Sequence, residues 1–209
     1  MQESHKRVQW VYESTSDQEL EQRYDQWAAD YDKDLAEEFA WNSPQHASDL
    51  FAKHVAKSAK ILDAGAGTGL VGECLAQAGY GDLVAMDLSQ GMLDEAKGKN
   101  VYNGFHQMAM GGPLDLLTDE FDAVISVGVF TQGHAPASSF DELVRITKPG
   151  GLIVFSLRVD LYETGGFKEF QCNLESSGKW ELAEVTERFQ PLPKGEPEVW
   201  HQIWGYRVK

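Results

Sequence analysis

The stretch ILDAGAGTGLVG, residues 61–72, combines an acidic residue with closely spaced glycines, a pattern typical of nucleotide-binding loops. Two glycine fingerprints overlap in it: G-x-G-x-G begins at Gly65, and G-x-G-x-x-G runs from Gly67 to Gly72. Such glycines allow unusual backbone angles and the close approach of a ligand, and the helix expected from Leu70 presents free N–H groups. The same spacing also fits a plain tight turn between a strand and a helix.

Asp63 helps to choose between the two fingerprints, because it places a carboxylate at the tip of the strand before the loop. The pyrophosphate of a dinucleotide would meet like charge there and would be repelled. S-adenosylmethionine has no phosphate and carries an ammonium and a sulfonium, so a carboxylate attracts it by about 1–4 kcal/mol. We therefore expect a cationic nucleoside in this loop. Asp63 also has the chemistry to cap the glycine turn, and both roles are compatible.

Asp87 ends the next expected strand, where an acidic side chain can accept hydrogen bonds from both ribose hydroxyls. This position indicates an adenosine but does not separate the two nucleotides. Ser89 is expected to cap the following helix. Leu88 and Met92 are then placed to face the adenine, although a methionine at helical spacing fits a hydrophobic core as well.

The segment SVGVFTQGHAP follows the fourth expected strand and lies at the same rim of the sheet. Gly128 and Val129 are expected to lie alongside the methionine part of the ligand. Thr131, Gln132 and His134 are expected to face a methyl acceptor. His134 is the candidate general base, since an imidazole near neutral pKa can take a proton from a hydroxyl or an amine. Methyl transfer mainly requires alignment of the nucleophile, so a base is optional. The alternative is that His134 caps the next helix or lies in solvent.

Short apolar runs that alternate with helical stretches predict an α/β fold with a parallel sheet covered on both faces. Strands are expected near 60–64, 82–87, 104–109, 121–127 and 151–158, with helices that start near Leu70, Gln90 and Ser138. KPGG should end the last of these helices, because proline cannot continue it and the two glycines allow a turn. After a helix around 166–177, WELAEVTERFQPL and EVWHQIWGYRVK predict an antiparallel hairpin on one sheet edge.

The N-terminal segment TSDQELEQRYDQWAADYDKDL predicts a helix that opens with a capping box of Ser16 and Glu19. Apolar and aromatic residues follow at spacings of three and four, namely Leu20, Tyr24, Trp27, Tyr31 and Leu35. This stripe either packs onto the domain or closes as a lid over a sulfonium, which gains about 1 kcal/mol from an aromatic face. A second helix is expected to be capped by Ser43, with Pro44 in its first turn.

Composition indicates one globular domain: 209 residues, 42% hydrophobic and 24% charged. No segment has the length of a membrane span, and the charged N-terminus lacks the apolar run of a secretory signal, so we expect a cytoplasmic protein without membrane contact. The balance of 18 basic and 33 acidic residues gives a net charge of −15, which repels nucleic acid. Cys74 and Cys172 are expected to be buried apolar side chains, and the histidines show no metal-ligand spacing, so we predict no metal.

Four blocks in this order, LDAGAGTG, VAMDLSQGML, FDAVISVGVF and LVRITKPGGLIVFS, resemble the class I S-adenosylmethionine-dependent methyltransferases over about residues 60–158. More narrowly, YDQWAADYDKDL and SVGVFTQGHAP are similar to the methyltransferase-like proteins of the Williams-Beuren region. The resemblance implies a Rossmann-like, seven-stranded, mostly parallel sheet of order 3-2-1-4-5-7-6. It also implies a helical lid or cap over residues 1–58 and a methyltransferase core over residues 59–209.

The resemblance implies roles for particular residues as well. The cofactor-binding positions it marks, together with those inferred above, are Tyr24, Trp27, Tyr31, Asp63, Gly65, Ala66, Gly67, Gly69, Asp87, Leu88, Met92, Met108, Ala109, Val127, Gly128 and Val129. Tyr31 lies where related enzymes place a lid tyrosine, and Met108 and Ala109 should border the adenine. Family members commonly have an aspartate at the position of Met108, which receives the adenine amino group. The methionine puts recognition of that edge in doubt and favours apolar contact.

The sequence thus predicts an enzyme that methylates a small molecule with S-adenosylmethionine and releases S-adenosylhomocysteine. The acceptor would be enclosed by the N-terminal helices and the segment 159–180, leaving the acceptor atom and the oligomeric state open. Two alternatives stand beside it. The first is a non-catalytic protein that binds the same cofactor as a sensor or partner subunit. The second is a nicotinamide-dependent oxidoreductase that uses Gly67, Gly69 and Gly72.

Overall fold

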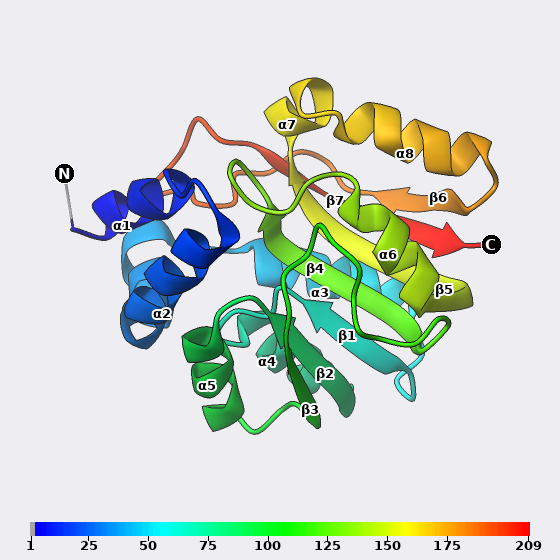
Figure 1. Ribbon diagram of the computed structural model, residues 1–209, viewed down its shortest axis with the longest axis horizontal. Coiled ribbons are helices and arrows are strands. Elements are labelled where there is room, and N and C mark those ends of the chain that lie inside the picture. Colours follow the sequence, from blue (N-terminus) through cyan, green and yellow to red (C-terminus); the bar gives the residue numbers. More distant parts are fainter. Residues whose placement is uncertain (1–2) are drawn as a thin grey trace.

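The computed structural model describes residues 3–209 and forms one seven-stranded sheet (Figure 1). The strands lie in the order β3-β2-β1-β4-β5-β7-β6, with only β7 antiparallel to its neighbours. Their bounds are β1 Lys60–Ala64, β2 Asp82–Asp87, β3 Gly104–Gln107, β4 Phe121–Phe130, β5 Thr147–Arg158, β6 Trp180–Val185 and β7 His201–Val208. The predicted strand order and the antiparallel C-terminal hairpin are therefore confirmed.

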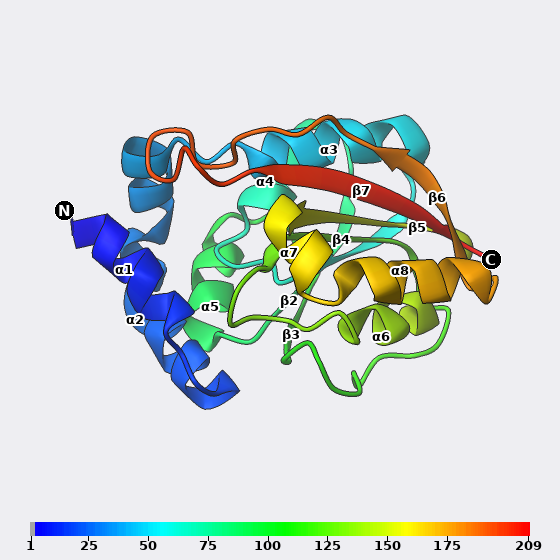
Figure 2. The same cartoon turned by 90° about the horizontal axis from the view of Figure 1, so that it is seen from above.

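Helices cover both faces of this sheet (Figure 2). On one face lie α3 (Ser43–His54), α4 (Leu70–Gln77) and α5 (Gln90–Gly98), and on the other lie α6 (Ser139–Ile146) and α8 (Phe167–Ser176). Successive strand residues point to opposite faces, so Ile61 packs in the first layer and Leu62 in the second. Both side chains are fully buried, which explains why the central strands are continuous apolar runs.

The N-terminal helices α1 (Glu3–Tyr12) and α2 (Asp17–Asp34) lie beyond the carboxyl ends of the parallel strands (Figures 1 and 2). Ser16 caps α2 as predicted, because its side chain accepts from the N–H of Glu19. The carboxylate of Glu19 returns to the N–H of Thr15, one residue earlier than in a standard capping box. After α2 the chain makes a π-helical turn over Leu35–Phe39. Helix α1 was not predicted.

Several boundaries differ from the sequence prediction, since β3 ends at Gln107 rather than 109 and β4 extends to Phe130 rather than 127. Asn42, not Ser43, is the N-cap of α3, so the expected cap is wrong by one residue. Strand β5 begins at Thr147 rather than 151, because Thr147 pairs with Phe121 before the strand bulges and resumes at Leu152 opposite Ala123. A short helix, α7 (Val159–Thr164), precedes α8.

The two cysteines are not buried as expected. Cys74 is half-buried and Cys172 is exposed. Within residues 3–209, no helix combines the length and apolar character needed to cross a membrane.

Candidate active site

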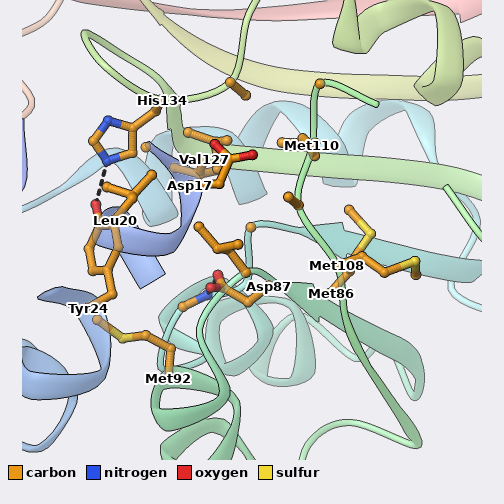
Figure 3. Close-up of a pocket in the computed structure, with 18 of the residues that line it drawn as sticks. Asp17, Leu20, Tyr24, Met86, Asp87, Met92, Met108, Met110, Val127 and His134 are labelled. Carbon is orange, nitrogen blue, oxygen red and sulfur yellow. Dashed lines mark hydrogen bonds between the residues drawn. The ribbon is translucent and has the colours of Figure 1, made fainter. Parts of the chain in front are cut away.

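A cavity of about 440 Å³ opens where the carboxyl ends of β1, β2 and β4 meet (Figure 3). Strand order reverses at this point. After β1 the chain adds β2 and β3 on one side of it, and then returns to add β4 on the other side. Ligands of open α/β sheets bind at such switch points, and the volume lies in the range of ordinary ligand sites. Thirteen of the predicted site residues line it: Tyr24, Tyr31, Gly65, Gly67, Asp87, Leu88, Met92, Met108, Ala109, Val127, Gly128, Val129 and His134.

The glycine loop presents its backbone to this cavity. The N–H groups of Gly65 and Ala66 both donate to the carbonyl of Met86, at 2.7 and 3.0 Å, which fixes the loop against β2. Gly65 has a φ of +81°, and a Cβ there would lie 2.1 Å from the side chain of Val129. Gly67 has a φ of +54° and no atom within 4 Å of an added Cβ, so open space lies over it. A ligand can therefore contact the backbone at Gly67.

Asp87 lies at the end of β2 with its carboxylate held by backbone donors. The N–H of Gly67 donates to Oδ2 at 2.8 Å, and the N–H of Ser89 donates to Oδ1 at 2.9 Å. Burial raises the pKa of Asp87, and these two hydrogen bonds oppose that effect. Each carboxylate oxygen has a second lone pair, so the group can still accept hydrogen bonds from a diol.

Asp63 is placed differently from the sequence expectation of a carboxylate at the cavity wall. It is fully buried beneath the loop and is not among the lining residues. The hydroxyl of Tyr102 donates to its Oδ2 at 2.6 Å, and the N–H of Gly72 in turn donates to that hydroxyl. Its Oδ1 has no hydrogen-bond partner among the described residues. Burial raises the pKa of Asp63 from 3.8 to about 7.

Ala66, Gly69 and Trp27, also predicted for cofactor binding, do not line the large cavity. Gly69 is instead the N-cap of α4 in the left-handed conformation. Trp27 is 3% exposed, donates from Nε1 to the carboxylate of Asp34 at 2.8 Å, and lines a smaller neighbouring cavity.

The aromatic stripe of α2 faces the site and the helix is fastened over it. Tyr24 and Tyr31 line the large cavity, with their rings edge to face at 6.3 Å. Asp25 accepts from the N–H of Gly91 at 2.8 Å and from the hydroxyl of Ser89 at 2.6 Å, which ties α2 to the first turn of α5. The structure thus holds α2 against the rim, in the position expected of a cover.

His134 joins this helix to the loop after β4 (Figure 3). Its Nδ1 lies 2.9 Å from the carbonyl of Gln132, which can only accept, so Nδ1 carries the proton. Its Nε2 therefore accepts from the hydroxyl of Tyr24, at 2.7 Å. Burial lowers the pKa of His134, so the ring is neutral at pH 7. It does not cap the next helix, because Ser138 is the N-cap of α6.

Sequence reasoning missed several lining residues, namely Asp17, Leu20, Met86, Met110, Gly111, Gly112, Ala135 and Pro136. Leu20 precedes Tyr24 by one helical turn, a signal that was available. Met86, Met108 and Met110 lie on one side of the cavity, and Met92 lies apart from them, near Tyr24 (Figure 3). Methionines adapt their shape and are polarizable, so the space between these side chains suits a flat apolar ring.

In the described part of the chain, no group of three or more His, Cys, Asp or Glu side chains is arranged to hold a metal ion.

Comparison with known proteins places this site in a family. Residues 62–155 match the family model described as "Methyltransferase domain". The chain is 35% identical to human methyltransferase-like protein 27 over 165 residues, 76% of this chain and 66% of that protein. It is 41% identical to the demethylmenaquinone methyltransferase of Clavibacter sepedonicus over 100 residues, 46% of this chain and 39% of that one. The chain therefore spans less than two thirds of the curated relatives it matches.

Solved structures share the fold. The TehB-like methyltransferase of Corynebacterium glutamicum matches with a TM-score of 0.64 and 22% identity, covering 89% of this chain and 98% of that one. The cyclase SpnF matches with a TM-score of 0.69 and 16% identity, covering 92% and 96%. A cyclase on this architecture shows that the fold alone does not determine the reaction.

Proposed function

The chain belongs to the class I S-adenosylmethionine-dependent methyltransferases, and we propose that it transfers the methyl group of this cofactor to a small-molecule acceptor. The observation that carries the proposal is the cavity at the switch point of the sheet. There the backbone at Gly67, the fixed carboxylate of Asp87 and a methionine-rich wall converge.

These residues fit the three parts of the cofactor. The methionine part would lie along Gly65 and Gly67, with Gly128 and Val129 opposite. Asp87 would accept from the ribose hydroxyls through its free lone pairs. Met92 and Met108 would sandwich the adenine, with the backbone at Ala109 at its edge, in place of the acidic side chain common in the family. Ala66, Gly69, Asp63 and Trp27 would then act from behind these groups, by shaping the loop and the lid.

When bound, S-adenosylmethionine supplies a methyl carbon activated by its sulfonium. The chain's own contribution is to align the acceptor, to exclude water and to accept a proton. The acceptor would gain this methyl group and lose a proton, so the chain's residues must hold the acceptor in line and take that proton. Tyr24 is placed to take the acceptor's proton while its own hydroxyl proton moves to Nε2 of His134. The candidate base thus acts through Tyr24.

Two features support a small acceptor. Helices α1 and α2 lie beyond the rim of the sheet (Figure 2), and side chains of α2 line the cavity, which narrows the approach for a large partner. The net charge of −15 opposes nucleic acid as a substrate. Because α1 and α2 lie beyond the rim of the sheet, we propose that they form the lid of the domain.

The test combines binding with turnover. We expect calorimetry to show binding of S-adenosylhomocysteine but not NADH, and an isotope-labelled methyl group to pass from S-adenosylmethionine to a compound in a metabolite extract. Asp87→Ala should weaken cofactor binding by about tenfold or more, since it removes charged hydrogen bonds to the ribose. Asp115→Ala is the matched control, because Asp115 is exposed and is not among the residues that line the cavity. Binding without any labelled product would support the non-catalytic alternative, and tight NADH binding would end the proposal.

A further inference from the structure

A second, smaller cavity of about 60 Å³ lies beside the first. Three residues, Tyr24, Tyr31 and Gly128, line both, so the two spaces meet at these side chains. The far walls come from α1, from α2 and from the segment that joins β6 to β7, which runs beside the N-terminal helices (Figures 1 and 2). With the methionine part of the cofactor along Gly128 as proposed above, this chamber would lie on the side from which an acceptor approaches the methyl carbon.

Most of this chamber is apolar and aromatic. Its walls include Trp27, Trp41, Leu35 and Leu192. A cavity needs roughly 10–15 Å³ of volume, measured in the same way, to hold one water molecule, so the chamber has room for about four to six water molecules. That space accommodates one ring rather than an extended chain.

Two polar atoms in the chamber wall lack a hydrogen-bond partner among the described residues, namely Oγ1 of Thr131, near the border with the first cavity, and Nδ1 of His201. His201 begins β7 and is 8% exposed, and its Nδ1 is buried without a hydrogen-bond partner among the described residues. Burial lowers the pKa of His201 to about 4, with a further contribution from the charge of Arg158, so the ring is neutral at pH 7. A buried polar atom without a partner costs stability, and a ligand that bonds to it recovers that loss.

We propose that this chamber is the acceptor subsite and that it takes a neutral, single-ring acceptor with a polar atom at the end remote from its nucleophile. The remote atom hydrogen-bonds to Nδ1 of His201, and the nucleophile faces the border at Tyr31 and Gly128. The inference rests on the proposed methyl transfer and names the class of its substrate. The acceptor's proton leaves through Tyr24, as described above, and the methyl carbon is the only group gained.

The charges around the chamber favour a neutral ligand. Arg158 approaches from the His201 side, but its guanidinium makes two hydrogen bonds to Asp160, at 2.8 and 3.0 Å. Glu196 lines the chamber and also interacts with the charge of Arg158, so its carboxylate already has a cation nearby. An ion that entered would lose its water without gaining a dedicated counter-ion, which is costly. The rival occupant is a cation held by Glu196.

The experiment uses three phenols of similar size that differ in charge. These are 4-hydroxybenzamide, which is neutral, tyramine, which is cationic, and 4-hydroxybenzoate, which is anionic. Their affinities are measured by saturation-transfer NMR and calorimetry on the full chain saturated with S-adenosylhomocysteine. We expect 4-hydroxybenzamide to bind about tenfold or more tightly than either ion, because no counter-ion compensates a charged group in the chamber.

Two variants locate the binding. Leu192→Trp fills the chamber and should abolish binding of 4-hydroxybenzamide, whereas Leu182→Trp, at an exposed position of β6, should leave it unchanged. His201→Phe keeps a ring beside Phe189 but removes the polar atom, and should weaken the amide by about fivefold to tenfold while sparing unsubstituted phenol.

The outcomes separate this inference from the proposed function. Failure of the wild-type chain to bind S-adenosylhomocysteine would refute the proposed function. Retained cofactor binding together with equal or tighter binding of tyramine or 4-hydroxybenzoate would overturn the neutral acceptor. Unchanged affinity for 4-hydroxybenzamide in both Leu192→Trp and His201→Phe would place the acceptor elsewhere.

Discussion

Asp63→Asn tests how burial controls the ionisation of the carboxylate beneath the glycine loop. Asp63 is fully buried, accepts one hydrogen bond from Tyr102, and has an oxygen without a partner among the described residues. Burial raises its pKa from 3.8 to about 7, because the charged form loses its water and gains little in return. Asparagine has the same shape, remains neutral, and can still accept from the Tyr102 hydroxyl.

The sign and size of the effect follow from proton linkage. Since the pKa of Asp63 is higher in the folded state than in the unfolded chain, the stabilisation from protonation is complete below pH 3.8 and is lost as the pH rises through about 7. At about 1.4 kcal/mol per pH unit, the interval from 3.8 to about 7 corresponds to about 4 kcal/mol. Asp63→Asn removes this cost, but an asparagine NH₂ group without a hydrogen-bond partner destabilises the fold by about 1–3 kcal/mol. We expect a net stabilisation of about 2 kcal/mol at alkaline pH, and a rise in Tm of about 4–8 °C.

The assay is thermal unfolding of the cofactor-free chain across pH, followed by calorimetry with S-adenosylmethionine. The gain in Tm should be largest above about pH 7 and should vanish near about pH 5, where the remaining linkage loss of about 1.6 kcal/mol is offset by the unpaired NH₂ group. Asp115→Asn, at an exposed site, is the control and should change neither. Cofactor affinity should fall in Asp63→Asn if the carboxylate attracts the ammonium. A variant that melts at or below the wild type at alkaline pH, with the control unaffected, would show that the buried carboxylate is not a burden on the fold.

Three further perturbations have defined outcomes. Gly65→Ala should lower Tm far more than Gly150→Ala, because both have φ above +80° but only at Gly65 would the new methyl lie 2.1 Å from another side chain. Asp25→Ala removes the acceptor that ties α2 to α5 and should cost about 0.5–2 kcal/mol in urea unfolding, with faster hydrogen exchange in α2; unchanged exchange would contradict the fastening. Tyr24→Phe removes the hydroxyl that donates to His134 and should slow single-turnover methylation at neutral pH while leaving cofactor affinity intact; equal rates for Tyr24→Phe and His134→Ala with the wild type would eliminate the proton path.

The central fold was predictable because its signals are local. Buried parallel strands are short apolar runs, and helices α4 and α5 begin at Leu70 and Gln90, where starts were predicted. Ser89 caps α5 with its side chain, whereas Gly69 precedes α4 without a side-chain cap. The start of β5 was missed because it depends on pairing: Thr147 joins the sheet only through its partner Phe121, across a bulge that no local pattern encodes. Helix α1 was missed for a similar reason, since its buried residues Val8 and Val11 are recognisable only against α2.

The site was predictable where backbone geometry dictates function and unpredictable where a distant side chain does. Gly65 and Gly67 were identified because glycine favours the positive φ values of such a loop, +81° and +54° here, and at Gly65 a Cβ would also collide with Val129. The burial of Asp63 depends on Tyr102, which lies 39 residues away and offers no sequence signal of its own. The alternation of β1 held part of the answer, because Asp63 shares a face with Ile61 and that face is packed under helices.

Asp63 and Asp87 lie near the carboxyl ends of the neighbouring strands β1 and β2, where Asp63 pairs with Ala85, two residues before Asp87. Their surroundings nevertheless favour different protonation states. Asp87 receives two backbone N–H groups that favour its charged form, so it is oriented to accept hydrogen bonds before any ligand arrives. Asp63 receives one neutral hydroxyl and stays near the midpoint of its titration at pH 7. A cation bound above the loop would draw Asp63 into its charged form and release a proton. The same electrostatics that make Asp63 costly in the empty protein would then favour a positively charged cofactor over one that carries phosphate.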